Sequence, residues 1–309
     1  MFATGRGRLA ALAAVAVGAA VALAGCASGD PLDEGGTGES SGSSETIVIG
    51  SQAYYSNEII AEIYAQALEA NGYTVDRQFQ IGQREVYLPE IEAGEIDLFP
   101  EYTGNLLQYW VPDTEAKTSD DVYAALQDAV PEGLRVLDQS PATDQDSYNV
   151  TKAFSDEYGV TSLEDLAGVP VPLTLGGNAE LETRPYGPQG LADTYGADVG
   201  FLAIEDSGGA LTVKALVDGQ VQLVNIYSAD PNIKANDLVT LEDPKGLFLA
   251  SNVVPLASEK VTDEIAAIID TISAAMTPAD LVALNDESVN GQRSAEDIAS
   301  AWLESKALF

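Results

Sequence analysis

A short unit that occurs twice restricts the fold of this chain more than any other feature. Tyr102 lies eight positions after Gly94, and Tyr227 lies eight positions after Gly219. In both copies an apolar run fills the interval, and a helical pattern precedes the glycine. The order helix, glycine C-cap, buried strand, tyrosine is therefore predicted twice. Two substructures that each present a tyrosine from the end of a strand are typical of a ligand clamp.

The first copy lies within EIDLFPEYTGNLL, residues 95–107. Ile96, Leu98 and Phe99 predict a short buried strand, which we expect Pro100 to end. Tyr102 follows in a polar turn that contains glycine, and such a turn on a rigid strand can fix a ring at a cleft. The alternative is a strand end whose half-buried tyrosine only packs.

The balance of charge is the most unusual feature of the composition. Lys and Arg number 14 against 49 Asp and Glu, so the formal net charge is −35, although the 46% apolar content is ordinary for a globular protein. A surface of this sign repels nucleic acids and anionic membranes, so we expect neither as a partner. It is compatible with a cationic ligand, but general acidity also serves solubility.

The chain contains no histidine, which excludes Ser-His-Asp and Cys-His catalysis and imidazole metal sites. Its single cysteine, Cys26, cannot form an internal disulfide. No motif requires a cofactor or a metal ion, and we expect none. Paired carboxylates remain as glycosidase-type catalysts, but 49 acidic residues produce such pairs by chance. We therefore expect a protein that is not an enzyme.

Residues 1–26 match an export signal that ends in a lipobox. Arg6 and Arg8 precede an alanine-rich apolar run, and Leu-Ala-Gly leads into Cys26. The run is short for a membrane span of about 20 residues, so we favour a signal over a transmembrane anchor. Cleavage before Cys26 and a lipid on its sulfur would anchor the protein to the extracytoplasmic face of the cell membrane. Residues 27–45, rich in Gly, Ser and acids, predict a flexible tether.

The remaining sequence alternates between strand and helix patterns, which predicts the α/β class. The first strand is expected at 46–50 and the next at 74–81. Between them Ser56 is the expected N-cap of a helix that Gly72 ends, with Tyr64 in its buried stripe. Later, Ser162 begins a capping box, and Thr277 followed by Pro278 predicts another helix start.

Three segments carry the most specific motifs of the chain. They are GSQAYYSNEIIAEIYAQALEANGYTV (50–75), EAGEIDLFPEYTG (92–104) and NIYSADPNIKANDLVTLED (225–243). Together they resemble the substrate-binding proteins of osmoprotectant ABC importers, which bind glycine betaine, choline, carnitine and related quaternary amines. The resemblance covers roughly residues 46–309, and PEYTG is its most specific element.

The resemblance implies a two-lobed periplasmic-binding-protein fold of type II, with a hinge and a ligand cleft between the lobes. Residues 46–144 and 252–309 would form lobe one, and residues 145–251 lobe two. It also implies a lipoprotein that captures its ligand outside the cytoplasm and delivers it to an ABC permease.

A quaternary ammonium group is bound by the faces of aromatic rings, at about 0.5–2 kcal/mol for each ring. Matching the family's motifs to this sequence assigns three rings: Tyr102 in PEYTG, Tyr148 in SYNV and Tyr227 in NIYSAD. The fourth aromatic position of the family aligns with Ser251, so the aromatic box is incomplete. Tyr54 or Tyr55, on a loop at the end of the first strand, is an alternative for the missing ring.

Three polar positions complete the implied site. Gln52 stands where relatives that bind betaine often have lysine, and glutamine only hydrogen-bonds a ligand carboxylate. Asn105 stands where they often have threonine. Arg184 matches an arginine near the ligand carboxylate and can clamp it bidentately, although a surface arginine is the alternative.

Three functions are thus open. The first is capture of a quaternary-ammonium osmoprotectant, favoured by the three retained tyrosines. The second is capture of a different polar or aromatic metabolite by the same fold, favoured by Ser251. The third is a secreted carboxylate-dependent hydrolase, which needs two acids across a cleft without a tyrosine box.

Overall fold

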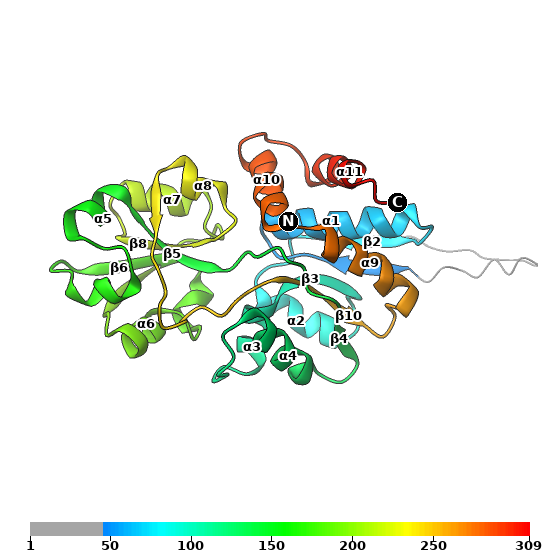
Figure 1. Cartoon of the computed structure of the whole chain (residues 1–309), viewed down its shortest axis with the longest axis horizontal. Helices are drawn as coiled ribbons and strands as arrows, with labels where there is room; N and C mark the ends of the chain where they lie inside the picture. Colours follow the sequence, from blue (N-terminus) through cyan, green and yellow to red (C-terminus); the bar gives the residue numbers. More distant parts are fainter. Residues whose placement is uncertain (1–45) are drawn as a thin grey trace, which may run out of the picture. The chain divides into compact units, whose positions relative to one another are not determined.

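The computed structural model describes residues 46–309, which contain two separate five-stranded sheets with helices on both faces of each (Figure 1). This arrangement confirms the predicted α/β class. The predicted signal, the lipobox with Cys26 and the tether lie outside the described residues. Among these residues no single helix is long and apolar enough to span a membrane. Only α9 (Asp263–Ala275) with α10 (Pro278–Val289), bent by 89°, meets that test as a pair.

The first sheet has the strand order β2-β1-β3-β10-β4. Its strands are β1 (Ile47–Gly50), β2 (Val75–Gln78), β3 (Leu98–Tyr102), β4 (Leu134–Val136) and β10 (Val253–Ser258). β1 pairs in parallel with β2 and β3, whereas β10 runs antiparallel to β3 and β4. β10, which comes late in the sequence, therefore lies beside β3, the strand that ends in Tyr102.

The second sheet repeats this plan with the order β7-β6-β8-β5-β9. Its strands are β5 (Asp146–Thr151), β6 (Leu173–Gly177), β7 (Val199–Ala203), β8 (Leu223–Tyr227) and β9 (Leu238–Thr240). β6 is parallel to β7 and β8, and β5 is antiparallel to β8 and β9. The chain passes between the sheets twice, after β4 and after β9.

Helices cover both faces of the first sheet, which explains why its three inner strands, β1, β3 and β10, are buried on both sides while the edge strand β2 is polar and exposed. One face packs against α1 (Tyr55–Ala70), α9 (Asp263–Ala275), α10 (Pro278–Val289) and α11 (Ala295–Lys306), and Tyr64 lies in this core as predicted. The other face packs against α2 (Arg84–Glu92), α3 (Thr103–Trp110) and α4 (Ser119–Ala129). The two helix groups lie on opposite sides of the sheet in Figure 1.

The second sheet has two smaller cores. Its helices are α5 (Lys152–Tyr158), α6 (Pro188–Tyr195), α7 (Ala210–Val217) and α8 (Pro231–Ala235), with short 3-10 turns at Leu163–Gly168 and Ala179–Thr183. The predicted capping box at Ser162 is confirmed, with Asp165 as its acidic partner. Thr277 caps α10 as predicted, and Pro278 begins that helix.

Three local predictions are wrong. Ser56 is not an N-cap: α1 begins at Tyr55, and the Ser56 hydroxyl lies 3.4 Å from Oδ2 of Asp144 instead. Pro100 does not end β3, which continues to Tyr102. Pro100 lies opposite Pro255 on β10. Because neither proline has a backbone N–H to donate, the pairing of β3 with β10 continues past this position. The strand expected at 74–81 is confined to β2.

Candidate functional site

The two copies of the repeated unit occupy equivalent places in the two sheets. In each, a helix (α2 or α7) ends before a glycine with positive φ, Gly94 at +78° and Gly219 at +73°, as the C-cap prediction requires. The strand that follows, β3 or β8, lies between a parallel and an antiparallel neighbour and ends in a tyrosine. Tyr102 and Tyr227 are therefore presented from matching strand ends.

Both tyrosines line one small enclosed space, which we call the inner cavity. Its volume is about 10 Å³, which holds one water molecule at most, so the side chains contact one another. The lining combines rings, amides and charges from both sheets: Gln52, Tyr54, Arg84, Tyr102, Asn105, Asp144, Asp146, Arg184 and Tyr227.

Three aromatic rings converge at this cavity. Tyr54, at the N-cap of α1, lies 5.0 Å from Tyr227 and 6.5 Å from Tyr102 between ring centroids. Its hydroxyl donates a hydrogen bond to the hydroxyl of Tyr102. Tyr54 is thus the third ring, and it contacts the rings of Tyr102 and Tyr227. It is one of the two alternatives that the sequence gives for the missing ring. The other, Tyr55, instead donates to Asp230, with 2.7 Å between its hydroxyl and Oδ2.

The loop that carries Gln52 and Tyr54 is fixed by the buried side chain of Asn57. Its Oδ1 accepts a hydrogen bond from the Gln52 backbone N–H at 2.8 Å, and its Nδ2 donates to the Pro100 carbonyl at 2.8 Å. One amide therefore joins the end of β1 to β3. The same amide lies 3.4 Å from the hydroxyl of Tyr102.

Two carboxylates that have no basic partner within residues 46–309 adjoin the rings. Asp144 accepts the N–H of Ala229 at 2.9 Å through Oδ1. Burial raises the pKa of its carboxyl to about 7, and the nearby carboxylate of Asp230 adds to the shift, although the Ala229 N–H opposes it. Asp146 accepts from the amides of Asn225 at 2.9 Å and Asn105 at 2.5 Å.

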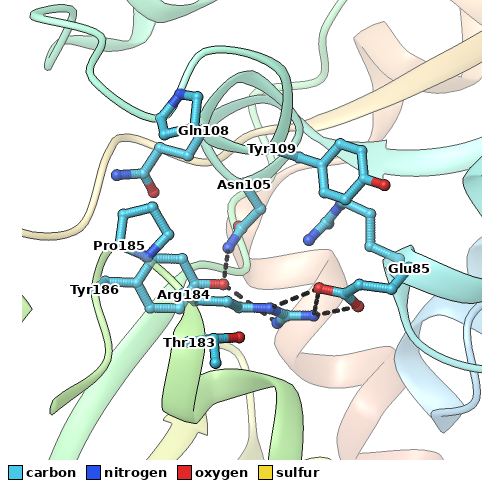
Figure 2. A pocket seen from close by; sticks show the side chains of 10 residues that line it. Glu85, Asn105, Gln108, Tyr109, Thr183, Arg184, Pro185 and Tyr186 are labelled. Atoms are coloured by element: carbon cyan, nitrogen blue, oxygen red, sulfur yellow. Dashed lines mark hydrogen bonds and ion pairs between the residues drawn. The ribbon is translucent and has the colours of Figure 1, made fainter. Parts of the chain in front are cut away.

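The two arginines of the cavity are each paired with a glutamate. Arg84 binds Glu101 through Nε and Nη2, both at 2.8 Å, and both side chains are buried. Glu101 also accepts the Tyr102 N–H at 2.9 Å, so this ion pair holds the strand end that carries the ring. Arg184 lies 3.2 Å from Glu85 in a more exposed pair (Figure 2).

The charges of the inner cavity and their partners do not balance. Two arginines face four carboxylates, an excess of two acids that belongs to Asp144 and Asp146. A buried carboxylate without a cation is unfavourable, which is the reason that burial raises the pKa of Asp144, and a cation beside it would favour the ionised form. Three ring faces beside them are a suitable surface for a diffuse positive charge. The arrangement can therefore accommodate a cationic group.

A buried donor points to a second feature of the ligand. Nε2 of Gln52 is buried and, within residues 46–309, has no hydrogen-bond partner. An unsatisfied amide donor costs about 1–3 kcal/mol unless a ligand oxygen accepts from it. The site therefore suits a molecule that has both a cation and an acceptor oxygen.

The structure brings together five of the seven binding residues assigned from the sequence: Gln52, Tyr102, Asn105, Arg184 and Tyr227. Ser251 does not line the cavity, but its hydroxyl donates to Oδ1 of Asn105 at 2.7 Å and accepts from the Gly104 N–H at 3.2 Å. Ser251 thus orients Asn105 and caps α3. A ring at this position would displace that contact.

A steric requirement explains why position 104, in the PEYTG motif, is a glycine. A Cβ at Gly104 would lie 2.7 Å from the carbonyl oxygen of Ala250, in the segment that leads into Ser251. The absence of a side chain lets this segment approach the start of α3. The glycine therefore supports the contact between Ser251 and Asn105.

Tyr148 does not reach the inner cavity. It is fully buried in the core of the second sheet, and its hydroxyl donates to the carbonyl of Tyr186. Its ring lies 5.0 Å from that of Phe248, edge to face. The structure thus gives Tyr148 a packing role, in contrast to the ligand contact that its motif implied.

Four lining residues were not assigned from the sequence: Tyr54, which was only an alternative, and Arg84, Asp144 and Asp146. The aspartates had a usable signal, because Asp144 lies just before the strand of Tyr148 and Asp146 begins it, where the chain crosses between the sheets. Arg84 had none, since an arginine at the start of a helix is ordinarily exposed.

Comparison with known proteins identifies the family. The family described as the substrate binding domain of ABC-type glycine betaine transport systems matches residues 45–305. The chain belongs to this family. It is therefore a substrate-binding protein of the glycine betaine and carnitine type of ABC transporter, a class that binds solutes outside the cytoplasm and is not a class of enzymes.

Individual relatives are distant but cover most of the chain. The glycine betaine-binding protein YehZ of Escherichia coli is 25% identical over 275 residues, 84% of this chain and 90% of the relative. The carnitine transport binding protein OpuCC of Listeria monocytogenes is 22% identical over 86% of this chain and 89% of its own. A solved glycine betaine/carnitine/choline ABC transporter protein, 20% identical, superposes with a TM-score of 0.68 over 85% of this chain and 99% of the other. This likeness confirms the type II periplasmic-binding-protein fold.

Proposed function

We propose that this protein captures a quaternary-ammonium osmoprotectant of the glycine betaine, choline or carnitine type. The observation that carries the proposal is the convergence of Tyr54, Tyr102 and Tyr227 with the unpaired carboxylates of Asp144 and Asp146. Rings attract the diffuse charge, and the carboxylates make the site negative. The named ligands of YehZ and OpuCC, glycine betaine and carnitine, support the same chemistry.

The remaining site residues have distinct roles in this proposal. Gln52 and Arg184 bind the acceptor or carboxylate end of the ligand. Asn105 lies between the two ends and is oriented by Ser251. Because the inner cavity holds only about 10 Å³, the rings must separate to admit a trimethylammonium group.

Calorimetric titration with glycine betaine, choline, carnitine, ectoine and proline tests this function. We expect the molecules with a quaternary nitrogen to bind and proline, whose nitrogen carries hydrogens, to bind more weakly. Binding of none of the quaternary amines, with binding of an uncharged aromatic or polar metabolite, would replace this function with the second one that the sequence left open.

We also propose that residues 46–144 with 252–309 and residues 145–251 act as lobes that close on the ligand. Contacts between the two sheets support this, since Tyr55 donates to Asp230 at 2.7 Å and Arg184 pairs with Glu85. Closure follows if the ligand binds the closed form more tightly. Small-angle scattering should then show a smaller radius of gyration at saturation, and an unchanged radius in the presence of bound ligand would contradict it.

Lipidation of Cys26 and delivery to an ABC permease complete the proposal. The motif Leu-Ala-Gly-Cys before a Gly/Ser-rich segment supports an extracytoplasmic lipid anchor. Cys26→Ala should move the protein from the membrane fraction to the medium in its native host. Mass spectrometry that finds an uncleaved, unmodified N-terminus would rule the anchor out.

A further inference from the structure

The repeated unit extends further towards the N-terminus than its glycine and tyrosine. Val86 lies eight positions before Gly94, and Leu211 lies eight positions before Gly219. Val86 is in the first turn of α2, beside the first sheet, and Leu211 is in the first turn of α7, beside the second (Figure 1). The two apolar side chains therefore occupy equivalent positions in the two copies of the unit.

Both of these side chains face solvent. Val86 is 52% exposed and Leu211 is 63% exposed, whereas the two residues that follow each of them in the chain are buried. The first turns of the two helices are thus oriented alike with respect to their sheets. A single exposed valine or leucine is ordinary on a protein surface. Such residues indicate an interaction surface only when they belong together.

A hydrogen bond between the two lobes links the starts of the two helices. Gln83, the N-cap residue of α2, donates from Nε2 to the hydroxyl of Ser207 at 3.2 Å. Ser207 lies two residues before the N-cap residue of α7. Because Val86 and Leu211 follow closely on these two residues, the spacing between their side chains is fixed while this hydrogen bond is present. Separation of the lobes would change that spacing.

The exposed charges on and next to the two helices are mainly acidic. At α2 they are three glutamates, and at α7 they are two acids and one lysine: Glu85, Glu90 and Glu92, then Glu205, Asp218 and Lys214. The lysine is itself paired with Asp218 at 2.6 Å. With the formal net charge of −35, this excess of acid repels a second copy of the chain and an anionic lipid surface. It attracts a partner whose apolar contacts are bordered by basic groups.

We propose that the first turns of α2 and α7 form a two-part docking surface for the ABC permease, with Val86 and Leu211 as its two apolar contacts. This inference rests on the proposed function, which includes delivery to that permease. Two equivalent contacts fit a partner with two like subunits, each of which offers an apolar hollow bordered by basic groups. Since the contacts have the required spacing only while Gln83 and Ser207 meet, the partner distinguishes the closed protein from the open one.

Uptake by cells of the native host tests the inference when it is compared with ligand binding. Val86→Asp and Leu211→Asp each place a charge on one half of the surface, far from the inner cavity in chemical role. The probe is radiolabelled glycine betaine or choline, whichever binds the purified parent protein more tightly in calorimetry. Each variant should bind this probe as the parent does, whereas the uptake rate that depends on this protein should fall at least about tenfold.

Two control variants keep the result specific. Leu211→Met retains an apolar side chain and should support the uptake rate of the parent. Val282→Asp places the same charge at a valine that is 44% exposed on α10, a helix that packs against α1, α8 and α11. It should also leave uptake unchanged. All substituted positions are exposed, and melting temperatures show whether each variant is folded.

The outcomes separate the inference from the function on which it rests. If either Val86→Asp or Leu211→Asp supports uptake at the rate of the parent, or if Val282→Asp loses as much, the docking surface is wrong and the ligand function stands. A parent protein that sediments as a dimer, with Leu211→Asp as a monomer, would assign the surface to a second copy instead. If the parent binds neither glycine betaine nor choline, the proposed function itself fails.

Discussion

Tyr148 and Tyr227 lie on neighbouring antiparallel strands and have different roles. Tyr227 is the last residue of β8, is only partly buried and lines the inner cavity. Tyr148 is the third residue of β5, opposite Asn225, and is fully buried in the core. Asp146 begins β5 and faces Tyr227 across the pair. Position along the strand, more than residue type, thus decides which side chains reach the inner cavity.

The largest expected effect comes from removing the buried ring of Tyr148. Tyr148→Ala should lower the free energy of unfolding by about 3–5 kcal/mol, because it removes a buried ring packed against Phe248 and leaves a cavity. Chemical denaturation measures this loss. Tyr148→Phe is the matched control and should cost about 1–3 kcal/mol, since only the hydrogen bond to the Tyr186 carbonyl is lost. If the Tyr148→Ala variant is stable but no longer binds a quaternary amine, Tyr148 contacts the ligand and the packing role is wrong.

The second largest effect concerns Tyr227, the tyrosine that lines the inner cavity. Tyr227→Ala should weaken binding of a quaternary amine by about 1–2 kcal/mol, near tenfold, because one ring face is lost. Tyr227→Phe keeps the face and should bind almost as the parent protein does. Calorimetry gives the affinities, and denaturation should show a smaller loss of stability than for Tyr148→Ala. Equal affinities for the alanine variant and the parent would contradict the role of this ring.

The smallest effect concerns pH and Asp144. Burial raises the pKa of its carboxyl to about 7, so the folded protein holds this proton more tightly than the unfolded chain does. Its contribution to stability therefore falls as the pH rises from about 4 to 7. Binding of a cation favours the ionised carboxylate, so choline affinity should increase several-fold between about pH 6 and 8.

Asp144→Asn is the matched control for this dependence, since its amide oxygen can still accept from the Ala229 N–H. The variant should bind choline more weakly at high pH and lose most of the increase. Calorimetric titrations at three pH values measure the choline affinity of both proteins. A pH profile that is the same in both proteins would show that another group is responsible.

The sequence was a good guide to the strand ends and a poor guide to the charges around them. Gly94 and Gly219 predicted both tyrosine-bearing units, because a helix stop, an apolar run and a ring leave few alternative structures. The capping box at Ser162 was equally local. Such features depend on neighbours in the chain, which the sequence displays directly.

The remaining site depends on contacts between distant segments. Arg84 pairs with Glu101 only because α2 packs beside β3, and Asp144 is buried only where the crossing segment meets Ala229. Ser251 reads as a missing ring in the sequence, whereas in the structure it holds Asn105. Ser56 was misassigned for the same reason, since its hydroxyl approaches a carboxylate from a distant segment.

The central claim is that the rings and carboxylates recognise the positive charge of a quaternary nitrogen. Calorimetric titration of the parent protein with choline and with its neutral isostere, in which a quaternary carbon replaces the nitrogen, tests this directly. Both molecules have the same shape, so they differ only in the charge presented to Tyr54, Tyr102, Tyr227 and the two aspartates. The account predicts that choline binds at least about tenfold more tightly. Equal affinity of the two molecules would contradict it.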